Sequence, residues 1–225
     1  MGLEFKLIAP LSPNVISTLI VITALCIIFI IVGNKIGKTD PKTMPKGFLF
    51  FWIMAVDTFN NFIKEHLRGD RFKFYGPYLF SIFMYLIFAN TISLFGLQPP
   101  LANLGVAMTF SLISFFMIKF TEIRYQGIKN KLVSLLGYVK PLSPIMLPIN
   151  LIGEFSTPIT MGMRLFGNLM SGMVISVMVY TALNWFLGIF AGVMIHAIFD
   201  IFFGLIQAFV FFMLSLITIS MASDN

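Results

Sequence analysis

The sequence predicts an all-α polytopic membrane protein with about five membrane helices, one interfacial amphipathic helix, and two long, strongly tilted last helices. Composition carries the first argument: 58% of the 225 residues are hydrophobic and 11% are charged, whereas soluble chains carry about 25% charged residues. Recurrent apolar runs of about 18 residues or more, long enough to span a bilayer, carry the second. The net charge of +6 would suggest nucleic acid for a soluble protein. Here the basic residues are placed as in a membrane protein, so no nucleic-acid partner is expected.

Hydropathy predicts one membrane domain over residues 1–225, with spans near 15–33, 75–95, 103–120, 142–182 and 186–222. The first apolar run is too long for a signal peptide, and its basic flank follows it, so we expect a retained span. The segment 48–63 is apolar and aromatic at its start and polar later, which predicts a helix lying at the interface. A short re-entrant segment fits the same pattern equally well.

The last two apolar blocks are too long for simple spans. A helix of about 40 residues extends roughly 60 Å, against a hydrocarbon core of roughly 30 Å. Each block is therefore either two short spans or one strongly tilted helix. No Gly-Pro or Asn-Gly turn interrupts 160–180 or 196–218, which favours tilt. Two tilted helices would present a broad face to a large curved partner.

Basic residues gather on one side of the predicted membrane. They lie between the first and second spans, and at or between the third and fourth: Lys35, Lys38, Lys42, Lys46, Lys64, Arg68, Arg71, Lys73, Lys119, Arg124, Lys129, Lys131 and Lys140. The loops around 96–103 and 182–186 carry no charge. The positive-inside rule places the basic segments in the cytoplasm, or on the matrix side of an organelle. We therefore expect the N-terminus outside and the C-terminus inside.

Arg164 lies within the fourth apolar block and cannot lose its charge at any workable pH. Placing it at membrane depth costs roughly 2.5 to 3.5 kcal/mol, so it needs an anionic partner, a wet cavity, or both. Thr157, Thr160, Asn168 and Ser171 follow helical spacing and form one stripe with Arg164.

The fifth block carries a second polar stripe of His196, Asp200 and Gln207, at spacings that share a helical face. Two facing stripes, one with a cation and one with an acid, are typical of a hydrated ion path. Other interpretations stay open. Asp200 could neutralise Arg164 in a static pair, and His196 could be a hydrogen-bonded packing residue. Asn168 and Gln207 could simply tie the helices together.

Glu154 lies ten residues before Arg164, nearer the cytoplasmic end of the predicted helix. It either serves the ion path or is simply solvated. His196 with Asp200 lacks the further ligands of a metal site, so neither a metal nor a cofactor is expected. The pattern Gly188-x-x-x-Gly192 permits close helix packing, although such spacings are frequent in membrane chains.

Two groups of motifs resemble subunit a of the bacterial F-type ATP synthase. The first comprises Leu147-Pro-Ile-Asn150, Glu154-Phe-Ser-Thr-Pro158 and Arg164-Leu-Phe-Gly-Asn168. The second, similar to the family's last helix, comprises Gln207-Ala-Phe-Val-Phe211, Met213-Leu-Ser-Leu216 and Ser220-Met-Ala-Ser223. Phe88-Ala-Asn90 and the segment 98–103 fit the family's central region less distinctively. The similarity runs over nearly the whole chain.

The resemblance implies an ion-conducting stator subunit with two offset half-channels for protons or sodium ions. Its last two helices would lie against a ring of c subunits, and its other partners would be peripheral-stalk b subunits and further ATP synthase subunits. Arg164 would face the ring carboxylates and separate the half-channels, with Asn168 and Gln207 nearby. No part of the chain is expected to bind ATP, so catalysis belongs to other subunits. We expect the plasma membrane of a bacterium in preference to a mitochondrial inner membrane.

The chain departs from the family at one acid. Many bacterial relatives carry an acid nine residues after the arginine, where this chain has Met173, and often a histidine seven residues before the glutamine, where it has Asp200. We hypothesise that the entrance acid has moved between facing helices to Asp200. His196 would line the same outer path, and Glu154 would lie toward the cytoplasmic exit.

Two rival functions fit the membrane pattern. A self-contained ion channel or secondary transporter would conduct ions as a purified chain in liposomes. A membrane assembly scaffold would tolerate Arg164→Ala.

Overall fold

The computed structural model describes residues 13–38, 47–67, 70–136 and 143–224. Within these ranges every regular element is a helix. Five helices of the described chain are long and apolar enough to cross a membrane: Pro13–Gly37, Arg71–Phe95, Leu104–Ile128, Ile145–Ala182 and Leu187–Ala222. The all-α polytopic fold class is confirmed. The basic residues of 39–46, 68–69 and 137–142, which contribute to the predicted orientation, lie outside the described residues, as do 1–12 and 225.

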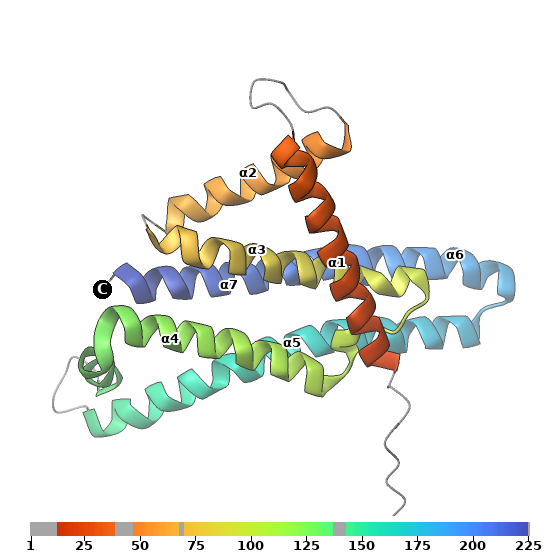
Figure 1. The fold of residues 1–225 in the computed structure, drawn as a ribbon. Helices are drawn as coiled ribbons and strands as arrows, with labels where there is room; N and C mark the ends of the chain where they lie inside the picture. Colours follow the sequence, from red (N-terminus) through yellow and green to blue (C-terminus); the bar gives the residue numbers. More distant parts are fainter. Residues whose placement is uncertain (1–12, 39–46, 68–69, 137–142, 225) are drawn as a thin grey trace, which may run out of the picture.

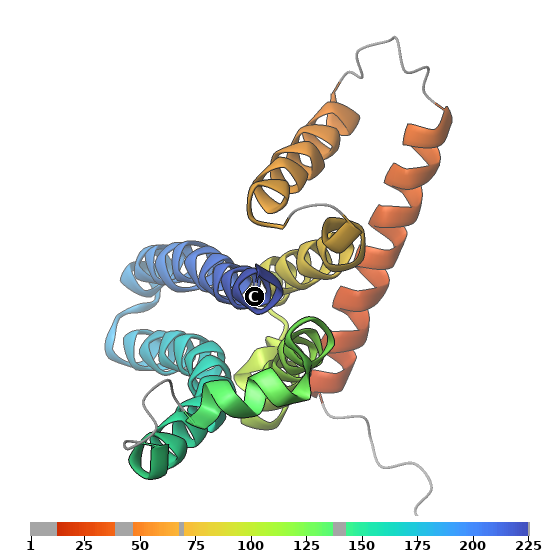
Figure 2. The ribbon, with the colours of Figure 1, turned by 90° about the vertical axis from the view of Figure 1, so that its left-hand side faces the viewer.

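The longest helical runs lie alongside one another and alternate in direction (Figure 1). In chain order the elements are α1 Pro13–Lys38, α2 Phe48–His66, α3 Asp70–Thr91, η1 Ile92–Phe95, η2 Pro100–Ala102, α4 Leu104–Leu136, α5 Ser143–Ala182, α6 Trp185–His196, η4 Ala197–Phe203 and α7 Gly204–Asp224. Figure 2 shows α3 beside α7 and α4 beside α5, with α1 leaning across the outside of α3. Helix α6, the π-helix η4 and α7 follow one another directly and form a single run.

The two longest runs show whether each long apolar block forms two short spans or one helix. Helix α5 continues over 40 residues although it contains Pro148 and Pro158, and the run α6–η4–α7 extends from Trp185 to Asp224. Each block is thus one continuous helical run. Pro158 is accommodated at a contact with α4, where the Ser111 hydroxyl donates to its carbonyl oxygen at 2.7 Å.

Helix α2 forms where the interfacial helix is predicted, and it is amphipathic. Trp52 is 6% exposed and Ile63 is fully buried against the helices beneath, whereas Asp57, Asn61 and Lys64 are exposed. The apolar Phe48, Phe51 and Met54 near its start are exposed as well. Its location at the membrane interface stays a prediction.

The core joins α3, α4, α5 and α7 through tightly packed side chains. One cluster contains Leu86, Ala107, Leu165, Ala208 and Phe211, each no more than 1% exposed. In a membrane such contacts stabilise through close van der Waals packing, because the hydrophobic effect does little between helices. Because Leu165 is packed in this core, it fixes the rotation of α5 about its axis. The directions in which the neighbouring side chains point are fixed with it.

The contact between α3 and the start of α7, where η4 ends, depends on a close approach to the backbone. Asn90, 1% exposed, donates its Nδ2 hydrogen to the carbonyl oxygen of Gly204 at 3.0 Å. A Cβ at Gly204 would lie 2.9 Å from the Cβ of Asn90. Glycine at this position therefore lets α3 reach the end of η4, and Asn90 holds it there.

We expect Gly162→Ala to weaken the contact between α4 and α5. A Cβ at this position would lie 2.7 Å from the Sδ atom and 3.2 Å from the Cα atom of Met108, and overpacking of this kind costs about 1 to 3 kcal/mol. Thermal unfolding of the detergent-solubilised protein measures the loss. Gly153→Ala, on the same helix with nothing within 4 Å of its Cβ, is the matched control. Equal melting temperatures for both variants would contradict the prediction.

Candidate functional site

Arg164 points away from the core. It is exposed, whereas its neighbour Leu165 is 1% exposed. No carboxylate oxygen of the described residues lies within 4.0 Å of the guanidinium. The static pair with Asp200 therefore does not form in this structure. A permanent cation at membrane depth with no counter-ion among the described residues requires water or an anion from another source.

A groove of about 400 Å³ surrounds the arginine where α5 meets η4 and α7. We call it the Arg164 groove, and it is lined by Arg164, Gly167, Asn168, Ser171, Phe199, Phe203, Ile206 and Gln207. The Nδ2 atom of Asn168 is buried there without a hydrogen-bond partner. Buried amide donors without a partner are rare in native structures, and one beside a groove marks a place for water or an outside ligand.

The other polar residues of the α5 stripe satisfy themselves locally. The hydroxyls of Thr157, Thr160 and Ser171 each donate to a backbone carbonyl of α5 three or four residues earlier. Such bonds let a hydroxyl sit on an otherwise apolar helix. Arg164, Asn168 and Gln207 supply the remaining polar groups of the groove.

Asp200 lies in a second, smaller cavity of about 180 Å³. This Asp200 cavity is lined by Ser93, Pro99, Leu169, Gly172, Met173, Ser176, Val177, His196 and Asp200. The Nδ1 atom of His196 lies 2.6 Å from Oδ2 of Asp200, and its Nε2 atom lies 3.1 Å from the hydroxyl oxygen of Tyr180 on α5. Asp200 itself is 7% exposed. Its buried carboxylate thus has its partner on its own helical run and is not available to Arg164.

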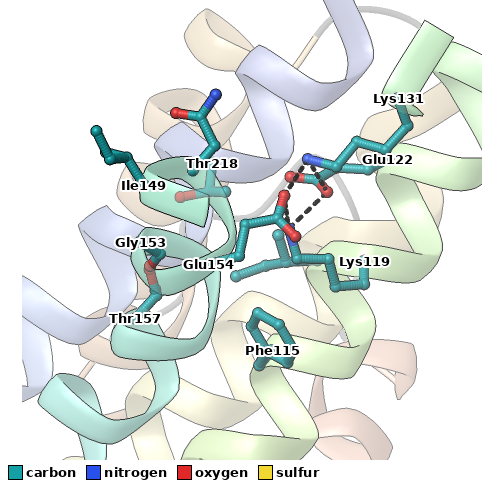
Figure 3. Close-up of a pocket in the computed structure, with 11 residues that line it drawn as sticks. Phe115, Lys119, Glu122, Lys131, Ile149, Gly153, Glu154, Thr157 and Thr218 are labelled. Carbon is teal, nitrogen blue, oxygen red and sulfur yellow. Dashed lines mark hydrogen bonds and ion pairs between the residues drawn. The ribbon is translucent and has the colours of Figure 1, made fainter. Parts of the chain in front are cut away.

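Glu154 lies in a third cavity, of about 550 Å³, which we call the Glu154 cavity. Its carboxylate contacts the ammonium groups of Lys119, at 2.8 Å, and of Lys131. Glu122 contacts the same two lysines, each at 2.8 Å. Figure 3 shows the four side chains converging from α4 and α5 with their charges alternating. Glu154 is thus held in an ion-pair network, and the interpretation of a freely solvated acid does not apply.

Lys131 reaches this network because α4 bends. Gly127 has φ 76° and ψ 155° inside the helix, a conformation that residues with a Cβ rarely adopt. Beyond it the chain turns away from the axis of α4 (Figure 2). Burial disfavours the ammonium form of Lys131, but hydrogen bonds and charge attraction from Glu122 and Glu154 outweigh burial and raise its pKa.

The π-helix η4 divides the residues that were expected to share one face. His196 and Asp200 line the Asp200 cavity, whereas Gln207, 8% exposed, lines the Arg164 groove. The expectation assumed a continuous α-helix, and a π-helical segment, with its i→i+5 hydrogen bonds, shifts the phase of everything beyond it. Of the six expected site residues, the groove brings together Arg164, Asn168 and Gln207.

Several residues of these cavities were missed by sequence reasoning. Lys119 and Glu122 had a usable signal, because two opposite charges three residues apart near the end of a predicted span indicate a pair. Lys131 had none, since its position depends on the bend at Gly127. Tyr180 had none either, because a tyrosine near a helix end is common at membrane interfaces.

Fold and cavities together define a polytopic helical membrane protein with ionisable side chains along and beside the contact of its two longest helical runs. The chain belongs to the ATP synthase A chain family, whose model matches residues 15–220. The family's subunit is part of the membrane sector of the complex and is not a catalytic subunit.

Individual relatives agree with this assignment. The chain is 30% identical to ATP synthase subunit a of Chlorobium phaeobacteroides, over 96% of its own length and 66% of the relative's. It is 32% identical to the same subunit of Sulfurihydrogenibium, over 74% and 78% of the two lengths. A relative from Propionigenium modestum, named as sodium ion specific, is 28% identical over 93% of this chain and 73% of its own length. The chain spans slightly less than two thirds of the Chlorobium protein.

We expect Gly127 and Lys131 to act on stability through the same contact. Gly127→Ala strains a backbone with positive φ, and Lys131→Met removes the ammonium group that the bend delivers to Glu122 and Glu154. The two losses should therefore be non-additive, with a coupling of about 0.5 to 3 kcal/mol. Thermal unfolding of the two single variants and the double variant measures the coupling. Strictly additive losses would show that the bend does not act through Lys131.

Proposed function

We propose that this chain is the ion-conducting stator subunit of a rotary ATP synthase, with two offset half-channels that serve the carboxylates of a c-subunit ring. The coupling ions are protons or sodium ions. Arg164 separates the half-channels, and the ring lies against the exposed face of α5 and the run α6–η4–α7. Peripheral-stalk b subunits and the catalytic subunits complete the complex.

The observation that carries this proposal is the exposed, unpaired Arg164 between two polar cavities. Glu154 lies ten residues before Arg164 and Ser176 twelve residues after it on the continuous helix α5. At 1.5 Å of rise per residue, these two residues lie roughly 15 and 18 Å from the arginine along the helix, in opposite directions. The nearest α5 residues that line the two cavities, Thr157 and Leu169, lie roughly 10 and 8 Å from it. Two access paths that end on either side of one fixed cation are the arrangement that a rotary ion pathway needs.

The charge of Arg164 supplies the chemistry. A ring carboxylate that faces lipid has to be neutral, by protonation or by binding a cation, because a bare charge there is too costly. Beside Arg164 the same carboxylate is favoured in its ionised form, since a nearby cation lowers its pKa. The arginine therefore releases the ion from each arriving site and blocks direct leakage between the half-channels.

Asp200 is the entrance acid of this scheme. The family resemblance places an acid at the position of Met173 in many relatives, and Met173 lines the same cavity as Asp200. A carboxylate on either wall would serve one and the same path. The relocated acid is thus accounted for by a shift across a single cavity, from α5 to η4.

Glu154 and its network mark the opposite access path. The network is net neutral and lies near the end of α4 that leads into a basic segment, which the positive-inside rule assigns to the cytoplasm. On this orientation the N-terminus is outside and the C-terminus is cytoplasmic, in the plasma membrane of a bacterium. The Asp200 cavity, beside the uncharged loop after α3, then opens outward.

We expect Arg164→Lys to abolish coupled transport, lowering ATP-driven ion uptake more than about 10-fold. Lysine keeps the charge, but it lacks the planar fork that engages a carboxylate and is more strongly hydrated. Uptake by inverted membrane vesicles that contain the whole complex measures the effect. Arg124→Lys makes the same chemical change on the exposed face of α4 and should be tolerated.

Normal uptake by the Arg164→Lys variant would contradict the proposal, and tolerance of Arg164→Ala would favour an assembly scaffold. Ion flux through the purified chain alone in liposomes would favour a self-contained channel or transporter.

We expect Asp200→Asn to abolish uptake in the same vesicles, because an amide can neither release nor accept a proton or pair with a cation. Glu154→Gln leaves Glu122 to hold both lysines and should reduce uptake less. Full uptake by Asp200→Asn, together with complete loss in Glu154→Gln, would show that the entrance acid has been assigned wrongly.

A further inference from the structure

His196 has a hydrogen-bond partner at each ring nitrogen. Asp200 Oδ2 lies 2.6 Å from Nδ1, and the Tyr180 hydroxyl oxygen lies 3.1 Å from Nε2. The acid belongs to η4 and the tyrosine to α5, so the imidazole bridges the two longest runs. Because the partner at one nitrogen determines which tautomer the other can adopt, a group at Nε2 affects the proton at Nδ1.

The position of Tyr180 depends on a glycine of the facing helix. A Cβ at Gly192 would lie 2.7 Å from Cε1 and 2.9 Å from Cζ of Tyr180, and closer still to its hydroxyl. One turn earlier, a Cβ at Gly188 would meet only Tyr180 Cδ1, at 4.0 Å. The Gly188-x-x-x-Gly192 pattern therefore does more than bring two backbones together. Because Gly192 has no Cβ, it leaves space for the Tyr180 ring against α6. In this position the Tyr180 hydroxyl reaches His196.

We propose that Tyr180, seated on Gly192, is a positioning residue of the Asp200 cavity that holds His196 with Nδ1 toward Asp200, so that this half-channel passes protons. The inference rests on the proposed function and extends it to the coupling ion and to two residues outside the family motifs. Tyr180 does not carry the transported proton, and it acts through His196.

The proton balance of the step is simple. Neutral His196 carries its proton on Nδ1 and donates a hydrogen bond from it to the Asp200 carboxylate. Its Nε2 atom accepts a hydrogen bond from the Tyr180 hydroxyl. A proton that arrives from water binds at Nε2, and the Tyr180 oxygen then accepts the new N–H. The imidazolium passes its Nδ1 proton to Asp200, leaving a neutral imidazole and a neutral carboxylic acid. One proton has entered, and one resides on Asp200.

The hydroxyl of Tyr180 suits both states, because it can donate to a bare nitrogen and accept from a protonated one. The His196 side chain is 33% exposed and Tyr180 is 47% exposed, so the Nε2 side of the ring is open while Asp200 is buried. The remaining residues that line the Asp200 cavity, among them Ser93, Met173 and Ser176, are not ionisable. His196 and Asp200 are thus the two ionisable side chains of the cavity lining.

The test compares variants of the complete ATP synthase in inverted vesicles, with ATP-driven proton uptake followed by dye quenching between pH 6 and 9. Tyr180→Phe keeps the ring and removes the hydroxyl, and Gly192→Ala displaces the ring. We expect each to slow uptake about 3- to 10-fold, the range for one lost hydrogen bond. We also expect each to move the pH midpoint of uptake by about half a unit or more, because the partner of Nε2 has changed.

Two matched variants control for the chemical changes. Gly188→Ala adds the same methyl group one turn away, and Tyr85→Phe removes a phenol hydroxyl on α3, where the ring stacks on Phe110. Both should pump at the rate and pH midpoint of the unaltered complex. The amount of subunit in purified complex shows whether each variant assembles.

Unchanged rates in Tyr180→Phe would overturn the inference. So would a uniform slowing with an unmoved pH midpoint, which is the behaviour of an interfacial anchor. Sodium uptake in place of proton uptake by the unaltered complex would overturn it as well, while leaving the stator function intact. If Arg164→Lys and Asp200→Asn also pump normally, the proposed function itself fails.

Discussion

The permanent charge of Arg164 on an outward face of the longest α-helix is the constraint on which the rest of the arrangement depends. A guanidinium cannot become neutral by losing a proton, whereas a lysine can lose a proton and a carboxylate can gain one. Leu165 is locked into the core, so α5 cannot rotate to hide the charge. The chain leaves the guanidinium beside an open groove with an unpartnered amide. No carboxylate of the described residues lies close enough to supply its counter-charge.

Asp200 and Glu154 differ from Arg164, because each has a partner of opposite or complementary character within the chain. Asp200 contacts His196, and Glu154 shares two lysines with Glu122. Burying an unpaired carboxylate is costly, and a bound one resists capture by a distant cation. The neutral network around Glu154 and the single pair at Asp200 therefore protect Arg164 from being neutralised internally. An arginine that was permanently paired within the chain would be unavailable to an anion from outside it.

How much could be predicted from sequence differs from residue to residue. The continuity of α5 followed from the lack of turn residues, and the grouping of Arg164 with Asn168 followed from α-helical spacing. The separation of Asp200 from Gln207 did not, because nothing in the apolar residues of η4 distinguishes π-helical from α-helical hydrogen bonding. The ion pairs of Lys131 could not be predicted either, since they depend on one positive φ angle at Gly127.

By itself the sequence determined the membrane class, the family, and the presence of one charge that could not be neutral. These properties depend on composition and on spacing along one helix, which are local. Only the tertiary structure decided that Asp200 is tied to His196 and Tyr180 and that Glu154 belongs to a four-charge network. It also decided that Arg164 has no carboxylate partner among the described residues. The contacts of Tyr180 with His196, and of Glu154 with Lys119 and Lys131, join residues on different helices. They are set by helix rotation and close backbone approach, which no local pattern encodes.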